Sequence, residues 1–227
     1  MKGKAAVSAI IPAYNEAERI EATLEGVRSI PEVDEVIVVD DGSEDFTSPI
    51  ARRYADSVIR LPSNCGKGTA MREGVRCAAG EVLLFVDADL KEHAKLCGSL
   101  LVPLLRKDAD MTIARFPPSL RKGGFGLVKG VARSGVLWLT GVKLDATLSG
   151  QRAVRREVWE SLDYFPAGFG VELGLTVHAL QSGYTVREVP LPIRHRETGR
   201  DWQGFRHRGK QLMEVLSTLF RLWRLPA

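Results

Sequence analysis

Residues Glu81–Leu90 read EVLLFVDADL, an apolar run that ends in two carboxylates, Asp87 and Asp89. The run is short, rich in Val, Leu and Phe, and bounded by polar residues, which is typical of a strand buried in a sheet. Two acids one residue apart at the end of such a strand can hold a divalent metal, because hard cations favour oxygen ligands. The alternative is structural, since an aspartate at this place can also cap the helix that follows.

Short apolar runs alternate with helical patterns through the first half of the chain. Strands are predicted at Val7–Ile11, Val33–Asp40, Ser57–Pro62, Glu81–Val86 and Asp110–Arg115. Helices are predicted at Glu16–Ile30, from Thr47 onward, at Lys67–Ala79 and at His93–Lys107. Ser48 and Pro49 have the residue types of an N-cap and a first helical turn, and Pro103 disturbs the last helix. Apolar strands separated by helices predict an α/β fold, with a parallel sheet that has helices on both faces.

The composition is that of a soluble globular protein. The 227 residues are 44% hydrophobic and 26% charged, with a formal net charge of +4. This mild basicity suits an anionic small molecule, a membrane surface or nucleic acid equally, and selects none of them. Cys65, Cys77 and Cys97 form no paired motif, so reduced thiols and a cytoplasmic location are expected. Apolar runs are too short for a membrane span, and Pro12 interrupts the N-terminal run, so no signal peptide is predicted either.

Polar clusters follow three of the predicted strands. They are PAYNEAE at Pro12–Glu18, VVDDGSED at Val38–Asp45 and VDADL at Val86–Leu90. Each cluster alone is also an ordinary turn or helix start. In a parallel sheet, however, the carboxyl ends of the strands share one edge, and ligands bind outside that edge. The three clusters together therefore predict a ligand site.

Two glycine-rich stretches resemble phosphate-binding motifs, but neither has all the residues that the motif requires. In NCGKGTA, Leu61 occupies the first glycine position of a P-loop and Gly68 replaces the Ser or Thr after Lys67. In GGFGLVKG, Lys129 replaces the third glycine of a dinucleotide-binding turn. A P-loop ATPase and a classical dinucleotide enzyme are therefore not supported. Lys67 still offers a cation near a helix start, which suits a diphosphate.

Four stretches together resemble a known family. In this order they are SAIIPAYNEAERI, VIVVDDGSED, GKGTAMREGVRCAAGEVLLFVDADL and LSGQRAVRREVWE. Their order and spacing, over about Val7 to Arg200, resemble GT-A glycosyltransferases of the family 2 type. The glycine-rich basic loop followed by SGQRAVRREV is similar to dolichol- and polyprenyl-phosphate mannosyl- or glucosyltransferases. AGFGVELGL and IRHR are similar to glucosyl-3-phosphoglycerate synthases.

The resemblance implies a Rossmann-like GT-A fold and a place for a nucleotide-sugar donor. The chain would be a single domain over 1–227, with a nucleotide-binding half at about 1–114 and an acceptor half at about 115–227. Glu16 and Asp40 would accept hydrogen bonds from the ribose and the base, with Asp41 sharing that task, and Lys67 would lie against the diphosphate. The expected donor-binding residues are Pro12, Tyr14, Glu16, Asp40, Asp41, Gly66, Lys67, Asp87, Ala88 and Asp89, with Lys67 and Asp89 also catalytic.

The resemblance also implies a metal. Asp89, with Asp87 nearby, would bind Mg²⁺ or Mn²⁺ and so offset the charge that grows on the leaving diphosphate. His195, in IRHRE, matches the position that completes the metal coordination in the phosphoglycerate enzymes. Its alternative is a solvated histidine in an arginine-rich turn.

The acceptor half lacks an obvious catalytic base. A base is expected just after the basic loop, where the chain reads LSGQ, and Gln151 cannot take a proton. Asp145 is interpreted as structural, and Glu172 is a second possible base. An ionised phosphate acceptor needs no base, and neither does a retaining enzyme whose leaving phosphate takes the proton. An anionic acceptor is therefore expected, bound by Arg121, Lys122, Lys129, Arg133, Gln151 and Glu172.

The predicted function is metal-dependent transfer of a sugar from a UDP-glucose or GDP-mannose type donor to polyprenyl phosphate. One alternative is a soluble acceptor such as 3-phosphoglycerate, and another is a non-catalytic module that only binds a nucleotide sugar. A nucleotidyltransferase is disfavoured, because an acidic stretch follows the first strand where that class has a basic glycine-rich loop. Nucleic acid is not expected as a partner. The oligomeric state is left open, with a homodimer as one possibility.

Two further segments bear on where the protein works. Arg115–Gly130 is cationic and rich in Pro and Gly, and it is predicted to be a long loop. Gly209–Leu225 has helical spacing, with apolar residues toward one face and cations available for another. This helix either docks on the domain or lies on the anionic inner face of a membrane.

Overall fold

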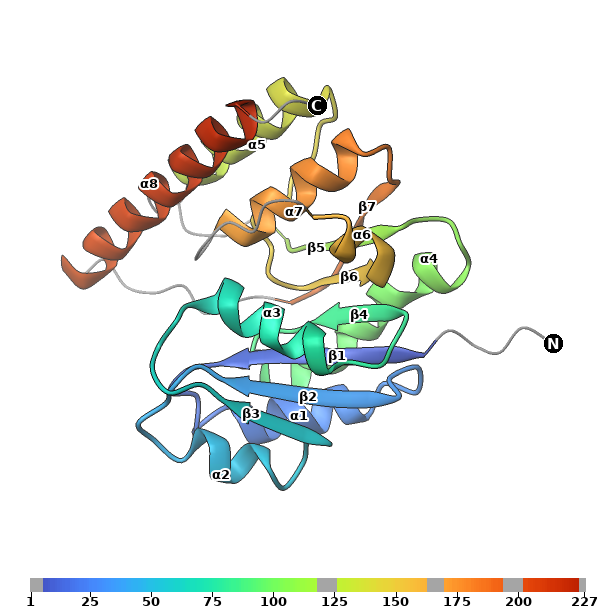
Figure 1. The fold of residues 1–227 in the computed structure, drawn as a ribbon, viewed down its shortest axis with the longest axis vertical. Helices are drawn as coiled ribbons and strands as arrows, with labels where there is room; N and C mark the ends of the chain where they lie inside the picture. Colours follow the sequence, from blue (N-terminus) through green and yellow to red (C-terminus); the bar gives the residue numbers. More distant parts are fainter. Residues whose placement is uncertain (1–5, 118–125, 163–169, 194–201, 225–227) are drawn as a thin grey trace.

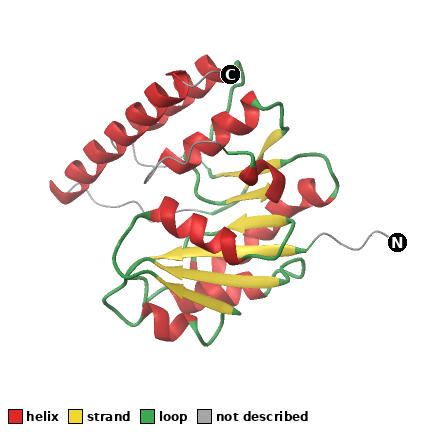
Figure 2. Ribbon diagram, viewed as in Figure 1, coloured by secondary structure: helices red, strands yellow, loops and turns green. Residues whose placement is uncertain are grey.

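The computed structural model describes residues 6–117, 126–162, 170–193 and 202–224, and in the last range the side chains from Leu212 onward. The strands of this part form one seven-stranded sheet in the order β3-β2-β1-β4-β6-β5-β7 (Figures 1 and 2). The strands are β1 Val7–Ala13, β2 Glu35–Asp40, β3 Ser57–Arg60, β4 Val82–Phe85, β5 Met111–Arg115, β6 Arg152–Arg155 and β7 Val186–Pro190. The predicted α/β fold is confirmed, and the sheet is mixed rather than wholly parallel.

The four strands β3, β2, β1 and β4 are parallel, so their carboxyl ends lie at the same edge. Ala13 at the end of β1 is in register with Asp40 at the end of β2, and Asp40 is in register with Arg60 of β3. On the other side of β1, Ile10 pairs with Phe85 of β4. The three polar clusters that follow β1, β2 and β4 therefore start from one edge of the sheet, as predicted.

The strand β6 was not predicted, and it runs antiparallel to both of its neighbours. Its first residue, Arg152, pairs with Phe85, the last residue of β4, and with Ile113 of β5. Because β6 is reversed, its amino end meets the carboxyl end of β4. The residues just before β6, Gly150 and Gln151, are thereby brought next to the residues just after β4.

Helices cover both faces of the sheet (Figure 1). They are α1 Ile20–Arg28, α2 Thr47–Ala51, α3 Lys67–Cys77, the 3-10 helix η1 Lys91–Leu100, α4 Leu101–Leu105, α5 Gly126–Thr140, α6 Arg156–Glu160, α7 Gly170–Gln181 and α8 Trp202–Arg224. One core contains α1, η1 and α4 side chains, such as Leu24 and Cys97, against Ile11 of β1. A second core contains α3, α5, α7 and α8 side chains against Ile10 and Phe85. The alternation of Ile10 and Ile11 between the cores follows from the two-residue period of a strand.

Several predicted boundaries were wrong. Ser48 is not an N-cap, because α2 begins at Thr47 after Phe46, and the Ser48 hydroxyl donates to Asp40 instead. The helix predicted at His93–Lys107 is a 3-10 helix followed by the short helix α4, which contains Pro103.

The acidic pair and the two later segments also differ from expectation. The alternative of Asp87 or Asp89 as a helix cap is not supported, because Leu90 is the N-cap of η1 and no side chain caps it. In the predicted loop Arg115–Gly130, residues 126–130 belong to α5, and 118–125 lie outside the described residues. The C-terminal helix starts at Trp202, earlier than the predicted Gly209.

Candidate functional site

Asp40, at the end of β2, fixes the loop that follows it. Its Oδ1 accepts the backbone N–H of Ser43 at 2.8 Å, and its Oδ2 accepts the hydroxyl of Ser48. The Arg60 Nε lies 3.9 Å from the same Oδ2. The Asp40 carboxylate is buried, and these partners stabilise its charge in the protein interior.

Asp41 ties the end of β2 to the start of α3. Its two oxygens accept the backbone N–H groups of Cys65 at 2.7 Å and Gly66 at 2.8 Å. Gly66 has φ 88, a left-handed conformation that glycine adopts without steric cost, and Lys67 is the first residue of α3. Asp41 therefore positions the segment that presents Lys67 to the edge of the sheet.

Glu16 lies at the same edge, after β1. Asn15 before it has φ 54, and the Asn15 N–H donates to Ser43 Oγ at 2.9 Å, which connects the β1 and β2 loops. The Glu16 Oε2 accepts a hydrogen bond from Arg19 Nη1 at 2.9 Å. Burial raises the pKa of Glu16 above its ordinary value; Arg19 opposes this rise, and the negative charge of Asp89 adds to it. The carboxylates of Glu16 and Asp89 are therefore close enough to repel each other electrostatically.

The other predicted donor residues of this edge are placed around these acids. Pro12 is half-buried and in register with Val39 of β2, and Tyr14 is exposed. Ala88, between the two aspartates, is buried, and its carbonyl accepts the hydroxyl of Thr23 at 2.8 Å. This last bond holds the segment of the two aspartates against α1.

Lys67 joins two carboxylates from distant parts of the chain. Its Nζ lies 2.6 Å from Asp87 Oδ1 and 2.8 Å from Glu172 Oε1 at the start of α7. Burial alone would lower the pKa of Lys67, but the two carboxylates outweigh it and raise that pKa above its ordinary value. Lys67 is therefore a permanent cation at neutral pH, bound between two anions.

Gln151 and Arg152 complete this enclosed network. The Gln151 Nε2 donates to Asp87 Oδ2 at 2.5 Å, so both oxygens of Asp87 have protein partners. Arg152 is fully buried, and its Nη1 donates to the carbonyl of Glu172 at 2.9 Å. Burial lowers the pKa of Arg152 to about 10, which still leaves it charged near neutrality. Sequence reasoning missed Arg152, because nothing in the local pattern RAVR distinguishes a buried arginine from a surface one.

Gly150 allows the network to close. A Cβ at this position would lie 2.5 Å from Lys67 Nζ and 2.6 Å from Asp87 Oδ2. Such distances are not found between real atoms of these types, so a side chain here would displace the lysine or the aspartate. A side chain at this position would therefore shift the ends of Lys67 and Asp87 from their places in the network.

Asp89 differs from Asp87 in its surroundings. It is exposed, and no hydrogen bond or ion pair to its carboxylate is found within the described residues. No group of three or more possible metal ligands is present in that part of the chain either. A nucleotide-bound Mg²⁺ needs only one or two carboxylates, because phosphates and waters supply its other ligands. Asp89 therefore fits a metal that arrives with a diphosphate.

The predicted acceptor residues do not form one cluster. Gln151 and Glu172 are buried in the network around Lys67. Arg133 is exposed on α5, and its Nε donates to the carbonyl of Asp145 at 2.9 Å; Lys129 is also exposed on α5. Arg121, Lys122 and His195 lie outside the described residues.

Residues 8–129 match the sequence profile of the family described as Glycosyl transferase family 2. The chain belongs to this family. Polyprenol monophosphomannose synthase of Mycolicibacterium smegmatis is 32% identical to it over 84% of this chain and 78% of the relative. Dolichol-phosphate mannosyltransferase of Pyrococcus furiosus is 27% identical over 96% of this chain, which spans 64% of that relative's length.

Solved structures of a glucosyl-3-phosphoglycerate synthase have the same fold. Glucosyl-3-phosphoglycerate synthase from Mycobacterium tuberculosis, in complex with Mn²⁺, UDP and glucosyl-3-phosphoglycerate, superposes with a TM-score of 0.82 and 27% identity. The superposition covers 98% of this chain and 81% of that one. The same enzyme was also solved with Mg²⁺ and UDP. The predicted GT-A fold and the prediction of a nucleotide-sugar-dependent glycosyltransferase are confirmed at the level of the family, and its relatives support dependence on a divalent metal.

Proposed function

We propose that this family 2 protein transfers a hexose from a nucleoside-diphosphate sugar to a polyprenyl phosphate. An oxygen of the acceptor phosphate attacks the anomeric carbon, the bond from that carbon to the diphosphate breaks, and the nucleoside diphosphate leaves. The acceptor oxygen is already ionised, so no proton has to be removed. The donor and the acceptor phosphate are the two reactants, and the transfer needs no third one.

The contrast between Asp87 and Asp89 carries the donor part of the proposal. Asp87 is neutralised by Lys67 and fixed by Gln151, whereas Asp89 is exposed at the same edge. We infer that Asp89 holds Mg²⁺ or Mn²⁺, which when bound would offset the negative charge on the departing diphosphate. Lys67, with Asp87, borders the diphosphate and the sugar, and it resists deprotonation because of its two carboxylates.

The nucleoside would lie over the ends of β1 and β2. Glu16 accepts hydrogen bonds from ribose hydroxyls, and Tyr14, two residues before Glu16, has an exposed ring. Asp40 and Asp41 shape this place through the backbone N–H groups that they hold. Within this proposal, residues 1–114 serve mainly the donor and residues 115–227 mainly the acceptor, within one domain.

The state of the two candidate bases supports a phosphate acceptor. Gln151 has no basic group and is bound to Asp87, and Glu172 is paired with Lys67 and is only 2% exposed. Neither is disposed to take a proton from an acceptor hydroxyl. The identity with polyprenol monophosphomannose synthase points to a lipid phosphate. A soluble phosphorylated acceptor such as 3-phosphoglycerate is a second candidate, supported by the superposition on glucosyl-3-phosphoglycerate synthase.

A transfer assay tests the proposal. Radiolabelled UDP-glucose and GDP-mannose are incubated with the protein and Mn²⁺, together with a polyprenyl phosphate in detergent, 3-phosphoglycerate or no acceptor. Label in the organic phase that depends on the lipid and disappears with EDTA is the expected result. Label only on 3-phosphoglycerate would select the second candidate. Donor binding without transfer to any acceptor would favour a non-catalytic module and contradict the proposal.

A further inference from the structure

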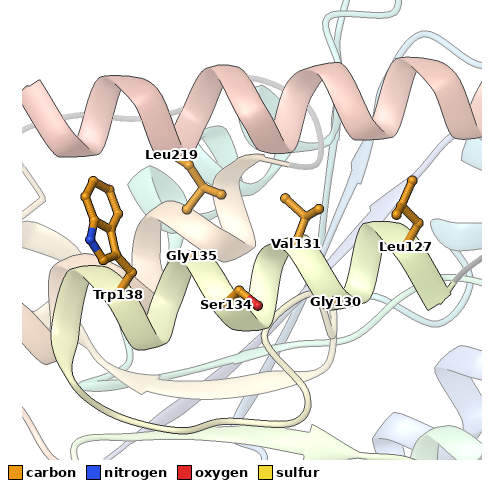
Figure 3. Close-up of a pocket in the computed structure, with 7 residues that line it drawn as sticks. All are labelled: Leu127, Gly130, Val131, Ser134, Gly135, Trp138 and Leu219. Atoms are coloured by element: carbon orange, nitrogen blue, oxygen red, sulfur yellow. The ribbon is translucent and has the colours of Figure 1, made fainter.

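The helices α5 and α8 pack side by side and form an outer layer of the molecule (Figures 1 and 3). Gly135 of α5 makes the close approach possible, because a Cβ there would lie 2.5 Å from both Leu219 Cδ atoms of α8. Figure 3 shows Leu219 directed at this place on α5. The two helices therefore act as one packed unit.

The outer side of this layer is apolar and exposed. A shallow groove between the helices is lined by Leu127, Gly130, Val131, Ser134, Gly135, Trp138 and Leu219. Trp138 is 67% exposed, Trp223 56% and Phe220 51%. Their rings touch, with centroids 6.2 Å apart for Trp138 and Trp223 and 6.0 Å apart for Phe220 and Trp223. We name the exposed apolar residues of both helices the aromatic surface: Leu127, Leu137, Trp138, Met213, Leu216, Phe220 and Trp223.

The charged residues on α5, on α8 and in the turn after α5 are mostly positive. Over 126–143 and 212–224, the charged residues are Lys129, Arg133, Lys143, Arg221 and Arg224, with Glu214 as the one acid. Arg133 is bound to Asp145, while Arg224 lies 4.5 Å from the Phe220 ring centroid. A second copy of the chain would bring a second set of cations against these, whereas an anionic bilayer would complement them.

We propose that the aromatic surface docks on an anionic lipid bilayer. Exposed Trp and Phe rings on helices that also carry Arg and Lys suit the boundary between headgroups and acyl chains. No helix in the described part of the chain is both long and apolar enough to cross a bilayer, so the contact is with the surface. The inference deepens the proposed function and rests on its lipid-phosphate acceptor, which is reached at a bilayer. In Figure 1, α8 begins on the side to which the arrowheads of β1 and β2 point, the side of the donor site.

Vesicle co-sedimentation of the full chain tests the docking. The probes are vesicles of phosphatidylcholine alone and of an equimolar mixture with phosphatidylglycerol, at low and high salt. We expect binding to the anionic vesicles that salt weakens. Trp138→Glu and Trp223→Glu should each weaken it at least tenfold, and Arg221→Gln about fivefold. Phe46→Glu is the matched control, because Phe46 is an aromatic residue, 74% exposed, that precedes α2 at the other end of the molecule.

The outcomes separate docking from catalysis. Thermal unfolding by circular dichroism checks that each variant folds, and light scattering without lipid gives the oligomeric state. Absence of binding at low salt, or equal binding by all variants, overturns the docking. The docking is also overturned if the protein does not bind vesicles but forms a dimer that Trp223→Glu dissociates. In that case the aromatic surface binds a second copy of the chain. Transfer to an acceptor dispersed in detergent should survive Trp138→Glu, and its absence in the unmodified protein would count against the proposed function instead.

Discussion

The candidate site has an enclosed side around Lys67 and an open side around Glu16 and Asp89, and the two sides differ in how their carboxylates are paired. On the enclosed side, Lys67 lies between Asp87 and Glu172, and Gln151 takes the remaining oxygen of Asp87. On the open side, Glu16 has the exposed partner Arg19, and no hydrogen bond or ion pair to Asp89 is found in the described ranges. The enclosed side is thus organised by the protein before any ligand binds. The open side keeps an exposed carboxylate, Asp89, that a ligand or its metal can approach.

Removal of the open carboxylate should have the largest effect on the reaction and almost none on the fold. We expect Asp89→Ala to lower kcat about 10³-fold, because charge on the leaving diphosphate loses its stabilisation. Its free energy of unfolding should stay within about 0.5 kcal/mol, since the side chain is exposed. Glu92→Ala, at an exposed acid of η1, is the control for both measurements. A variant with full activity would remove Asp89 from the metal site.

Removal of the enclosed cation, Lys67, should instead lower the stability of the fold. We expect Lys67→Met to lower the free energy of unfolding by about 3 kcal/mol, because it removes the cation that Asp87 and Glu172 share, and Glu172 is deeply buried. Urea denaturation measures it, with Lys95→Met at an exposed lysine as the control. Adding Glu172→Gln should recover part of the loss, because the buried charge is then gone. Strict additivity of the two changes would contradict the coupling.

A methyl group at Gly150 should destabilise the enclosed side by displacing the side chains that it contacts. We expect Gly150→Ala to lower the free energy of unfolding by about 2 kcal/mol, since the new Cβ would collide with Lys67 and Asp87. Gly130→Ala in α5 is the matched control, because no atom lies within 4 Å of a Cβ there. The control should be neutral or slightly stabilising. If the two variants unfold alike, the close contact at Gly150 does not exist in solution.

The smallest expected effect concerns pH on the open side. Burial raises the pKa of Glu16, so its carboxylate is protonated in a window above the ordinary value of 4.5. Loss of a charged acceptor weakens a hydrogen bond, and we expect UDP affinity to fall about fivefold as the pH drops through this window. Glu16→Gln should remove that part of the pH dependence in calorimetric titrations. The same raised pKa means that protonated Glu16 favours folding at low pH, a contribution lost as the pH rises through the folded value. An unchanged pH profile in Glu16→Gln would rule out Glu16 as the titrating group.

The open side could be predicted from the sequence, and the enclosed side largely could not. The edge formed by β1, β2 and β4 follows from the alternation of apolar strands and helices, and Asp40 ends β2 while Glu16 and Asp89 lie in the segments that follow β1 and β4. Such placement is local, because each acid follows its own strand.

The enclosed side depends on pairings between distant segments. Lys67 contacts Glu172, and Asp87 contacts Gln151, without any periodic pattern that connects them. The strand β6 is only four residues long and reads RAVR, so its extended form is set by β4 and β5 rather than by its own residues. The different environments of Asp87 and Asp89 also follow from β6, because Gln151 lies just before that strand. The sequence pattern alone therefore predicted one metal site for both acids.

The sheet order has a consequence for synthesis on the ribosome. Within the sheet of the described residues, β5 pairs with β6 and β7, and the edge of β4 that faces away from β1 pairs with β6, so both strands wait for segments made later. When the chain has emerged from the ribosome as far as Arg115, it therefore exposes an unpaired central edge and an unpaired strand, which are features that promote aggregation. The completed sheet can be reached only once residues 152–190 have left the exit tunnel, so protection of the growing chain by chaperones matters most in that interval.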